Sequence, residues 1–207
     1  MQELTIPINE ETIRCLRVGD PVSLSGVMMT GRDTVHKWMV KTFIYNTRQP
    51  QGDDLDVYEV IKPLLNGGVI YHCGPVVAGL ETREHQFVAA GPTTSIREEP
   101  YQGDVMRHFN LRGVIGKGGM GPKTLAACQE VPGVYLHAIG GAASLIAQAV
   151  VKVVEVYKLE FGVPEAMWVI EVKDFPAVVT MDSHGGSLHA EIESKSRTVL
   201  EELLVIE

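Results

Sequence analysis

The feature that most limits the fold is a series of short apolar runs, each ending in glycine or proline, that begins near residue 67. Such runs are typical of buried strands, and helical patterns lie between several of them. Alternating strands and helices predict an α/β layered domain. The runs are GGVIYHCGPVV, HQFVAAGPTTS, LRGVIGKGG, VPGVYLHAIGG, MWVIEVKDFP and AVVTMDSHGG.

The first 66 residues have a different texture, and we expect a more β-rich portion there. LTIPI and CLRVGDPVSLSGVMM read as strands with a turn at residues 18–21, and Asp33 can cap a helix that begins at Thr34. The polar stretch at about 46–60 reads as a long surface loop. The whole chain, 1–207, is expected to form a single domain in which 67–207 alternates between strand and helix.

Three helices are expected in the second part of the chain. Pro122 suits the first position of a helix over TLAACQ. Residues 143–161 give the clearest helical pattern, with one apolar stripe and Gly162 as a stop. Residues 194–207, SKSRTVLEELLVIE, read as another amphipathic helix.

Charge and hydropathy exclude several classes of function. The net charge is −8, and no run of Lys or Arg could follow a phosphate backbone, which argues against nucleic-acid binding. No stretch reaches the roughly 18 apolar residues of a membrane span, and the first residues lack the apolar core of a signal peptide. We therefore expect a cytoplasmic protein.

The three cysteines, Cys15, Cys73 and Cys128, are odd in number and widely spaced, which argues against a disulfide framework. Three thiolates could hold an iron–sulfur cluster with one iron open to substrate. No C-x-x-C pair supports that interpretation, however, and cysteine is among the residues most often buried. Burial is the favoured interpretation of all three.

The stretch GVIGKGGMG contains G-x-G-x-x-G at Gly116, Gly118 and Gly121. A dinucleotide fingerprint also needs an acidic residue about 20 positions further on, and VYLHAIGG offers none there. A Walker A loop is absent as well. The glycines are better explained by a tight turn with positive φ that places Lys117 at the end of a strand.

Two more loops of this kind end apolar runs, TGRDTVH with Arg32 and AAGPTTSIR with Arg97. Arginine binds a carboxylate through two parallel hydrogen bonds, and lysine supplies a point charge. A single Arg or Lys in such a loop is usually a solvent-exposed surface charge. Together, Arg32, Arg97 and Lys117 would suit a small substrate with two negative charges.

The motifs TGRDTVH, YHCGPV, AAGPTTSIR and VIGKGGMG, in this order, resemble the β subunit of the two-subunit class I fumarases and tartrate dehydratases. The resemblance covers roughly residues 16–182. It implies a swivelling β/β/α-type domain. It also implies that a [4Fe-4S] cluster is bound by three cysteines of a partner α subunit in a hetero-oligomer, so that this chain holds no metal and is inactive alone.

The resemblance also implies a role for each site residue. Arg32, Arg97 and Lys117 would bind the substrate carboxylates, and Thr93 would take part in proton transfer. The Thr93 hydroxyl could instead serve only to form a hydrogen bond within its loop. The histidine is open between substrate contact and a structural role. The family often has Arg-Met-Asp or Arg-Met-Glu where this chain has Arg97-Glu98-Glu99, which puts the local acidic contact in doubt. On this resemblance, the expected catalytic residue is Thr93, and the expected substrate-binding residues are Arg32, His36, Arg97 and Lys117.

The favoured function is therefore the β subunit of an iron–sulfur hydro-lyase that hydrates fumarate reversibly to malate. L-tartrate dehydration to oxaloacetate would use the same loops, and nothing in the chain separates the two. A non-catalytic binding subunit is the alternative from another class.

Overall fold

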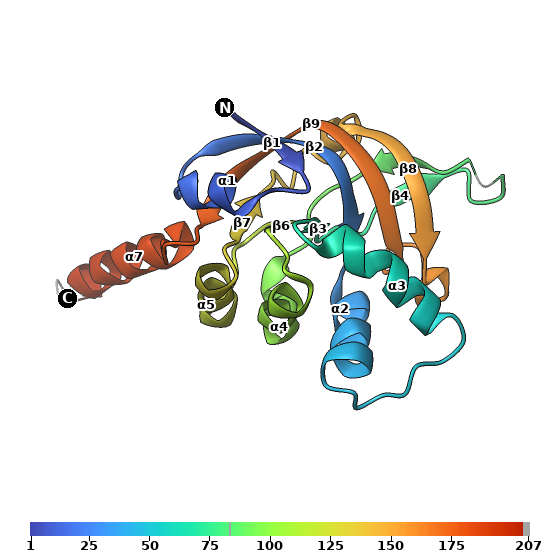
Figure 1. Cartoon of the computed structure of the whole chain (residues 1–207). Coiled ribbons are helices and arrows are strands. Elements are labelled where there is room, and N and C mark those ends of the chain that lie inside the picture. The colour runs from blue at the N-terminus through green and yellow to red at the C-terminus, as the bar shows by residue number, and fades with distance from the viewer. Residues whose placement is uncertain (83, 205–207) are drawn as a thin grey trace.

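The computed structural model of the chain describes residues 1–82 and 84–204 (Figure 1). Strands and helices alternate through most of it, which confirms the α/β layered class. The strands are β1 (Gln2–Ile6), β2 (Pro21–Thr30), β3 (Val69–Tyr71), β4 (Val76–Ala78), β5 (Gln86–Ala89), β6 (Gly113–Gly116), β7 (Val134–His137), β8 (Val150–Tyr157) and β9 (Met167–Met181). The helices are α1 (Glu10–Cys15), α2 (Asp33–Met39), η1 (Val40–Ile44), α3 (Asp54–Leu65), η2 (Ser95–Glu98), α4 (Glu99–Phe109), α5 (Pro122–Glu130), α6 (Ala143–Ala147), η3 (Leu159–Phe161) and α7 (Leu188–Leu204).

Seven of the strands form one sheet, in the order β1-β2-β3-β6-β7-β9-β8. The first five are parallel to their neighbours, and β9 is antiparallel to β7, β8 and β2. Because β9 pairs with both β7 and β2, the sheet closes on itself through these two contacts. The strands β4 and β5 form a separate antiparallel hairpin.

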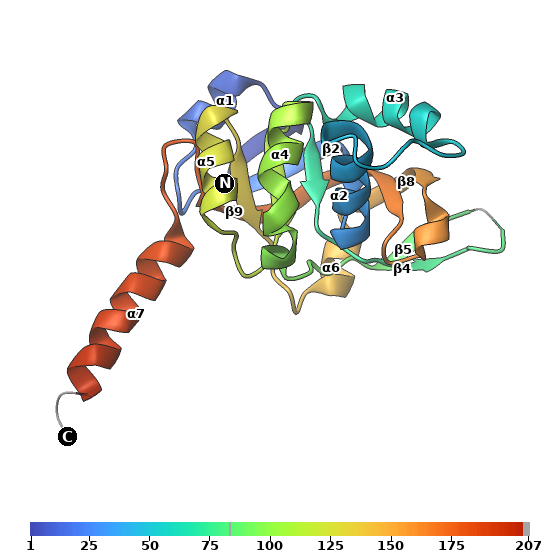
Figure 2. The same cartoon turned by 90° about the horizontal axis from the view of Figure 1, so that it is seen from below.

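Apolar residues lie on both faces of the strands and form two cores. One core fills the inner side of the curled sheet and includes Leu24, Tyr71, Trp168 and Phe175. The other lies between the outer side and helices α2, α3, α4 and α5, and includes Met39, with further residues from the helices and the strands. Figure 1 shows these helices below the curled sheet, and Figure 2, which is seen from below, shows α5, α4 and α2 side by side.

The first 66 residues contain β1 and the long β2, but also α1, α2 and α3, so helices are more prominent there than expected. The expected loop at 46–60 is wrong from residue 54 onward, because α3 begins at Asp54. Its buried side chains, Val57, Ile61 and Leu65, recur every four residues, and this apolar spacing continues past the polar stretch.

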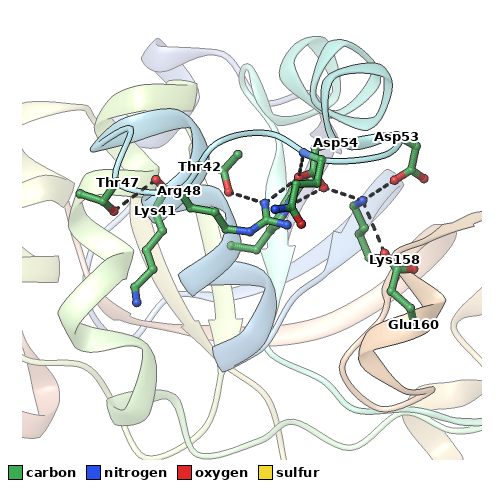
Figure 3. A network of polar contacts seen from close by, with 10 residues as sticks. Lys41, Thr42, Thr47, Arg48, Asp53, Asp54, Lys158 and Glu160 are labelled. Carbon is green, nitrogen blue, oxygen red and sulfur yellow. Dashed lines mark hydrogen bonds and ion pairs between the residues drawn. The ribbon is translucent and has the colours of Figure 1, made fainter.

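A buried network of charges fixes the start of α3 (Figure 3). Lys158, whose side chain is 3% exposed, pairs with Asp53, Asp54 and Glu160. Asp54 also accepts hydrogen bonds from Arg48 at 2.6 Å and from the Trp38 ring nitrogen at 2.9 Å. The pKa of Asp54 is held below its usual range, because these contacts outweigh the cost of burial. The loop before α3 is therefore tied to η3 and to α2.

The helix expected at 143–161 is also wrong. Only Ala143–Ala147 is α-helical; Val150–Tyr157 forms strand β8, which pairs with β9, and Leu159–Phe161 is the short 3-10 helix η3. The segment VVKVVEVY is dominated by valine, whose branched Cβ favours strands and disfavours helices. Its valines also fall at a helical spacing, so the apolar pattern fits a helix as well as a strand.

The helix expected to begin at Thr34 with Asp33 as its cap is α2, but it begins at Asp33, and Arg32 is the N-cap residue. The other two helix predictions hold. Helix α5 begins at Pro122, and α7 covers the described part of the helix expected at 194–207, of which 205–207 lie outside the described residues. Within the described chain, no helix is both long enough and apolar enough to cross a membrane.

Candidate active site

The candidate site is assembled by loops that follow the parallel strands. Strands β2, β3, β6 and β7 end level with one another, since Thr30 pairs with Tyr71, Tyr71 with Ile115, and Gly116 with His137. In a parallel sheet, the loops beyond the carboxyl ends meet at one edge, where ligands commonly bind. The loops from β2 and β6 carry Arg32 and Lys117, and the chain returning from the β4–β5 hairpin brings Thr93 and Arg97 to the same edge.

Backbone hydrogen bonds hold the loops of Thr93 and Lys117 together. The Lys117 amide donates to the Thr93 carbonyl at 3.2 Å, and the Ser95 amide donates to the Lys117 carbonyl at 3.0 Å. The Thr93 amide donates to the carbonyl of His72, at the end of β3, at 2.7 Å. The Thr93 loop, the Lys117 loop and the residue that follows β3, His72, are therefore joined by backbone hydrogen bonds at the edge of the sheet.

Glycines around Lys117 allow this close packing. Gly118 and Gly119 have φ of +78° and +80°, which only glycine adopts readily. A Cβ on Gly116 would lie 1.7 Å from the Ser95 hydroxyl, and one on Gly119 would lie 2.6 Å from the His189 ring. The Lys117 side chain runs against Gly140, with its Nζ 3.5 Å from the place where a Cβ would be. The glycines thus serve turns and close contacts, as the sequence indicates.

The three cations are held in different ways. Arg97 forms an ion pair with Asp33, and Arg32 lies 3.0 Å from Glu165. Among the described residues, Lys117 belongs to no ion pair. Because Asp33 directly follows Arg32, the pair with Arg97 joins two of the three loops.

The Thr93 side chain is half-buried, and its hydroxyl donates a hydrogen bond to the His72 carbonyl at 3.2 Å. In this arrangement the hydroxyl proton serves the backbone, while the lone pairs of Oγ1 can still accept a hydrogen bond. The geometry therefore fits the loop-stabilising interpretation and leaves the catalytic one as a prediction.

His36 lies beneath the loops and is fully buried. Its Nδ1 is 3.0 Å from the Arg32 carbonyl, and its Nε2 is 2.8 Å from the side-chain amide of Gln102. Burial lowers the pKa of His36, so the ring is neutral and carries its proton on Nδ1, beside the carbonyl that can only accept. His36 therefore supports the backbone at Arg32 rather than facing the open edge.

A second buried histidine, His72, completes a polar network that sequence reasoning missed. Its Nε2 is 2.8 Å from the same amide of Gln102, and its Nδ1 is 2.8 Å from the Ser95 hydroxyl. Burial, with the neighbouring His36, lowers the pKa of His72 to about 3. The amide of Gln102 satisfies both neutral rings when its NH2 group faces them. The only signal in the sequence is that the histidine directly follows a strand.

The acidic pair after Arg97 has two separate tasks. Glu99 caps α5, accepting from the amides of Gly121 and Lys123 at 2.8 Å each and from the Thr124 hydroxyl at 2.6 Å. It thereby fixes the end of the loop that carries Lys117.

Glu98 is 1% exposed and lies against Asp33. Oxygen atoms of both carboxyl groups, Glu98 Oε2 and Asp33 Oδ1, are buried and have no donor among the described residues. Burial, together with the Asp33 carboxylate, raises the pKa of Glu98 to about 8. The pKa of Asp33 is lowered even though burial opposes this, because Glu98 and Arg97 donate to it. A Glu98 that keeps its proton at neutral pH can donate it to the Asp33 carboxylate, which is then held beside Arg97.

The cysteines do not gather into a metal site. Cys73 and Cys128 are buried in different cores, and Cys15 is exposed. Burial raises the pKa of each of the two buried thiols to about 12, so neither is a thiolate at neutral pH. Within residues 1–82 and 84–204, no cluster of three His, Cys, Asp or Glu side chains could hold a metal ion.

Comparison with known proteins places this chain in a family. The family model described as "Fumarase C-terminus" matches residues 2–192. The chain is 54% identical over 194 residues to "Putative fumarate hydratase class I" of Geobacillus stearothermophilus, an alignment that covers 93% of this chain and 34% of that protein. It therefore spans about a third of that relative's length.

Relatives of similar length to this chain are also found. It is 36% identical over 192 residues to "L(+)-tartrate dehydratase subunit beta" of Escherichia coli (strain K12), covering 91% of this chain and 86% of that one. It is 35% identical over 199 residues to "Putative L(+)-tartrate dehydratase subunit beta" of Methanocaldococcus jannaschii, covering 95% of each. The match to the family model spans nearly the whole chain, and the chain therefore belongs to the fumarase C-terminus family.

Proposed function

We propose that this chain is the β subunit of a hydro-lyase that hydrates fumarate reversibly to malate, at a site that it shares with an α subunit. The observation that carries the proposal is the meeting of three cation-bearing loops around Thr93 at one edge of the sheet. The relatives supply two further supports: one is named a fumarate hydratase and is about three times as long, and others are named β subunits. The same domain can belong to one long chain or form a separate subunit of a two-subunit protein.

In this proposal Arg32, Arg97 and Lys117 bind the two carboxylates of the substrate. Removing a proton next to a carboxylate spreads negative charge onto that carboxylate in the transition state, and fixed cations at the site stabilise it. Asp33 and Glu165 hold the two arginines in position before the substrate binds. A substrate carboxylate then exchanges with these acids as the partner of the guanidinium groups.

Thr93 is the proposed proton-transfer residue. Its Oγ1 can accept a proton from the substrate only if its own proton passes on to a neighbouring group, because a free threonine hydroxyl is a weak base at neutral pH. The contact with the His72 carbonyl fixes the direction of the hydroxyl. The ammonium group of Lys117, on the adjoining loop, is the cation that would stabilise Thr93 Oγ1 as an alkoxide once its proton has passed on.

The [4Fe-4S] cluster is assigned in this proposal to the α subunit, in a hetero-oligomer with this chain. The separate burial of Cys73 and Cys128 supports that assignment. Exposed apolar side chains beside the site, Ile96, Ile139 and Leu145, are the proposed contacts with the α subunit. We also propose that the chain forms a single domain, which the pairing of β9 with β2 supports. A cytoplasmic location is proposed as well, and the three free thiols support it.

The test is reconstitution with the α subunit, followed by anaerobic assay on fumarate, malate and both tartrates. Lys117→Ala and Arg97→Ala are each expected to lower kcat/KM by about 100-fold or more, the effect of removing one group that stabilises transition-state charge. Lys123→Ala is the matched control, since Lys123 is exposed on α5 outside the loops. Unchanged activity in both site variants would contradict the site assignment.

Dehydration of L-tartrate to oxaloacetate is the second candidate, favoured by the β-subunit relatives that match this chain over most of their own length. The same assay separates the two reactions by their kcat/KM ratio. A non-catalytic binding subunit is the third candidate, and it predicts that no hydro-lyase activity depends on adding this chain.

A further inference from the structure

Helix α7 projects away from the rest of the molecule (Figures 1 and 2). Contacts with the body are made at its first turn, where the His189 Nε2 lies 3.2 Å from the Thr180 hydroxyl and the ring packs against Gly119. From residue 190 to residue 204, every side chain is exposed. The helix is thus anchored at one end, and most of its length has no partner within the described chain.

The projecting part carries an apolar stripe. Ile192, Val199, Leu200, Leu203 and Leu204 are 53–67% exposed; the last four recur at three- and four-residue spacing, and Ile192 lies seven residues, or two turns, before Val199. A helix with one apolar stripe normally buries it against another element. Three of these side chains border a shallow hollow with a volume of about 370 Å³.

The match to the family model bears on which partner covers the apolar stripe of α7. The family model ends at residue 192, so nearly all of the projecting part lies beyond the segment that the model matches. A contact surface that all members of the family need for a common partner subunit is expected inside that segment. The stripe is therefore not the expected contact with such a subunit, and the charges beside the stripe indicate what covers it instead.

We propose that α7 pairs with α7 of a second copy of this chain, antiparallel and related by a two-fold axis. An isologous contact of this kind uses one self-complementary patch twice. In the register that faces the stripes, Ile192 packs against Leu203 of the second copy and Ser196 packs against Val199 of the second copy. The small serine leaves room for the valine at the centre of the contact.

Charge supports the antiparallel direction. Lys195 and Glu202 lie on the same flank of the stripe, seven residues apart. In the antiparallel register this flank faces its own copy, so each Lys195 meets a Glu202 of the second copy and the pair forms twice. In a parallel pair, Lys195 would instead face Leu200 of the second copy, and neither charge would be matched.

The paired segment is short. Residues 191–204 overlap in this register, and at 1.5 Å per residue they extend over roughly 20 Å. The area buried is below the roughly 1,200–2,000 Å² of a stable interface, so the dimer is weak and depends on protein concentration. The proposal does not depend on the proposed function, and its test needs no activity.

The test is sedimentation velocity of the full chain over a concentration series. The wild type is expected to shift from monomer to dimer, and Val199→Asp is expected to stay monomeric. Lys195→Glu and Glu202→Lys are each expected to weaken association by about tenfold or more, because each places like charges opposite each other twice. The double variant Lys195→Glu/Glu202→Lys restores both pairs and is expected to restore the dimer.

Glu201→Lys is the matched control, since Glu201 lies on the opposite face of α7, and it should leave association unchanged. Circular dichroism confirms that each variant keeps its helix content. A wild type that stays monomeric at every concentration overturns the proposal. So does a dimer that the double charge exchange fails to restore, or a stripe that binds only a reconstituted α subunit.

Discussion

Glu98→Gln isolates the proton that Glu98 shares with Asp33. The unfolded chain releases the Glu98 proton near pH 4.5, whereas in the folded chain burial and the Asp33 carboxylate retain it up to about pH 8. Unfolding between these values releases a proton, so the stability contributed by the protonated group is full below pH 4.5 and is lost as the pH rises to 8. Glutamine keeps the shape and a donor but has no proton to lose.

The magnitude follows from 1.36 kcal/mol for each pH unit between the two pKa values, a total of roughly 4–5 kcal/mol. Partial screening by water lowers this to a few kcal/mol. Urea unfolding at steps from pH 5 to pH 8 should show the free energy of unfolding of Glu98→Gln rising relative to wild type by about 1 kcal/mol per unit. Subtracting the wild type removes the contribution of a nearby group that does not depend on Glu98, such as His36, whereas the pKa values of Asp33 and Tyr135 depend on Glu98 and change with it.

Glu59→Gln is the control, because Glu59 is exposed on α3 and its variant should track the wild type at every pH. A constant difference between Glu98→Gln and wild type from pH 5 to pH 8 would refute the reasoning, since it would mean that Glu98 is ionised throughout this range.

Three more substitutions test the supports around the site by urea unfolding at pH 7. Glu99→Ala should cost about 1–3 kcal/mol, because the first amides of α5 lose their acceptor. Lys158→Met should cost about 3 kcal/mol, since a buried carboxylate loses its cation. Gly119→Ala should cost at least about 1 kcal/mol, because of its positive φ and its contact with His189, whereas Gly141→Ala, in open space, should cost less. Equal losses in the two glycine variants would contradict that explanation.

The strands and the site loops could be predicted because each is marked locally. An apolar run that ends in glycine marks both a buried strand and the place where its loop begins, which located Arg32, Arg97 and Lys117. Parallel strands then bring such loops to one edge without further information. The sequence could not show which of the cations are already paired, because Glu165 is 133 residues away from Arg32.

Two elements were mispredicted because a local pattern had two readings. The valines of 150–157 fit a helical stripe as well as a strand, and pairing with β9 decided between them. Asp53 and Asp54 read as loop residues until their ion pairs with Lys158 and the burial of Asp54 are known. The position of His36 could not be predicted for the same reason: a histidine three residues into a helix can face the loops or the core, and its buried partner Gln102 lies 66 residues away.

Strand β9 has a consequence for the synthesis of the chain. It ends at residue 181, and it supplies the antiparallel partner of β2, which ends at residue 30. A nascent chain that has emerged only as far as α6 holds β2 and β7 without this partner, so two strand edges stay open on the ribosome. Pairings this distant along the chain also form slowly. Synthesis of the last quarter of the polypeptide is therefore the step that covers these strand edges and ends the aggregation-prone stage.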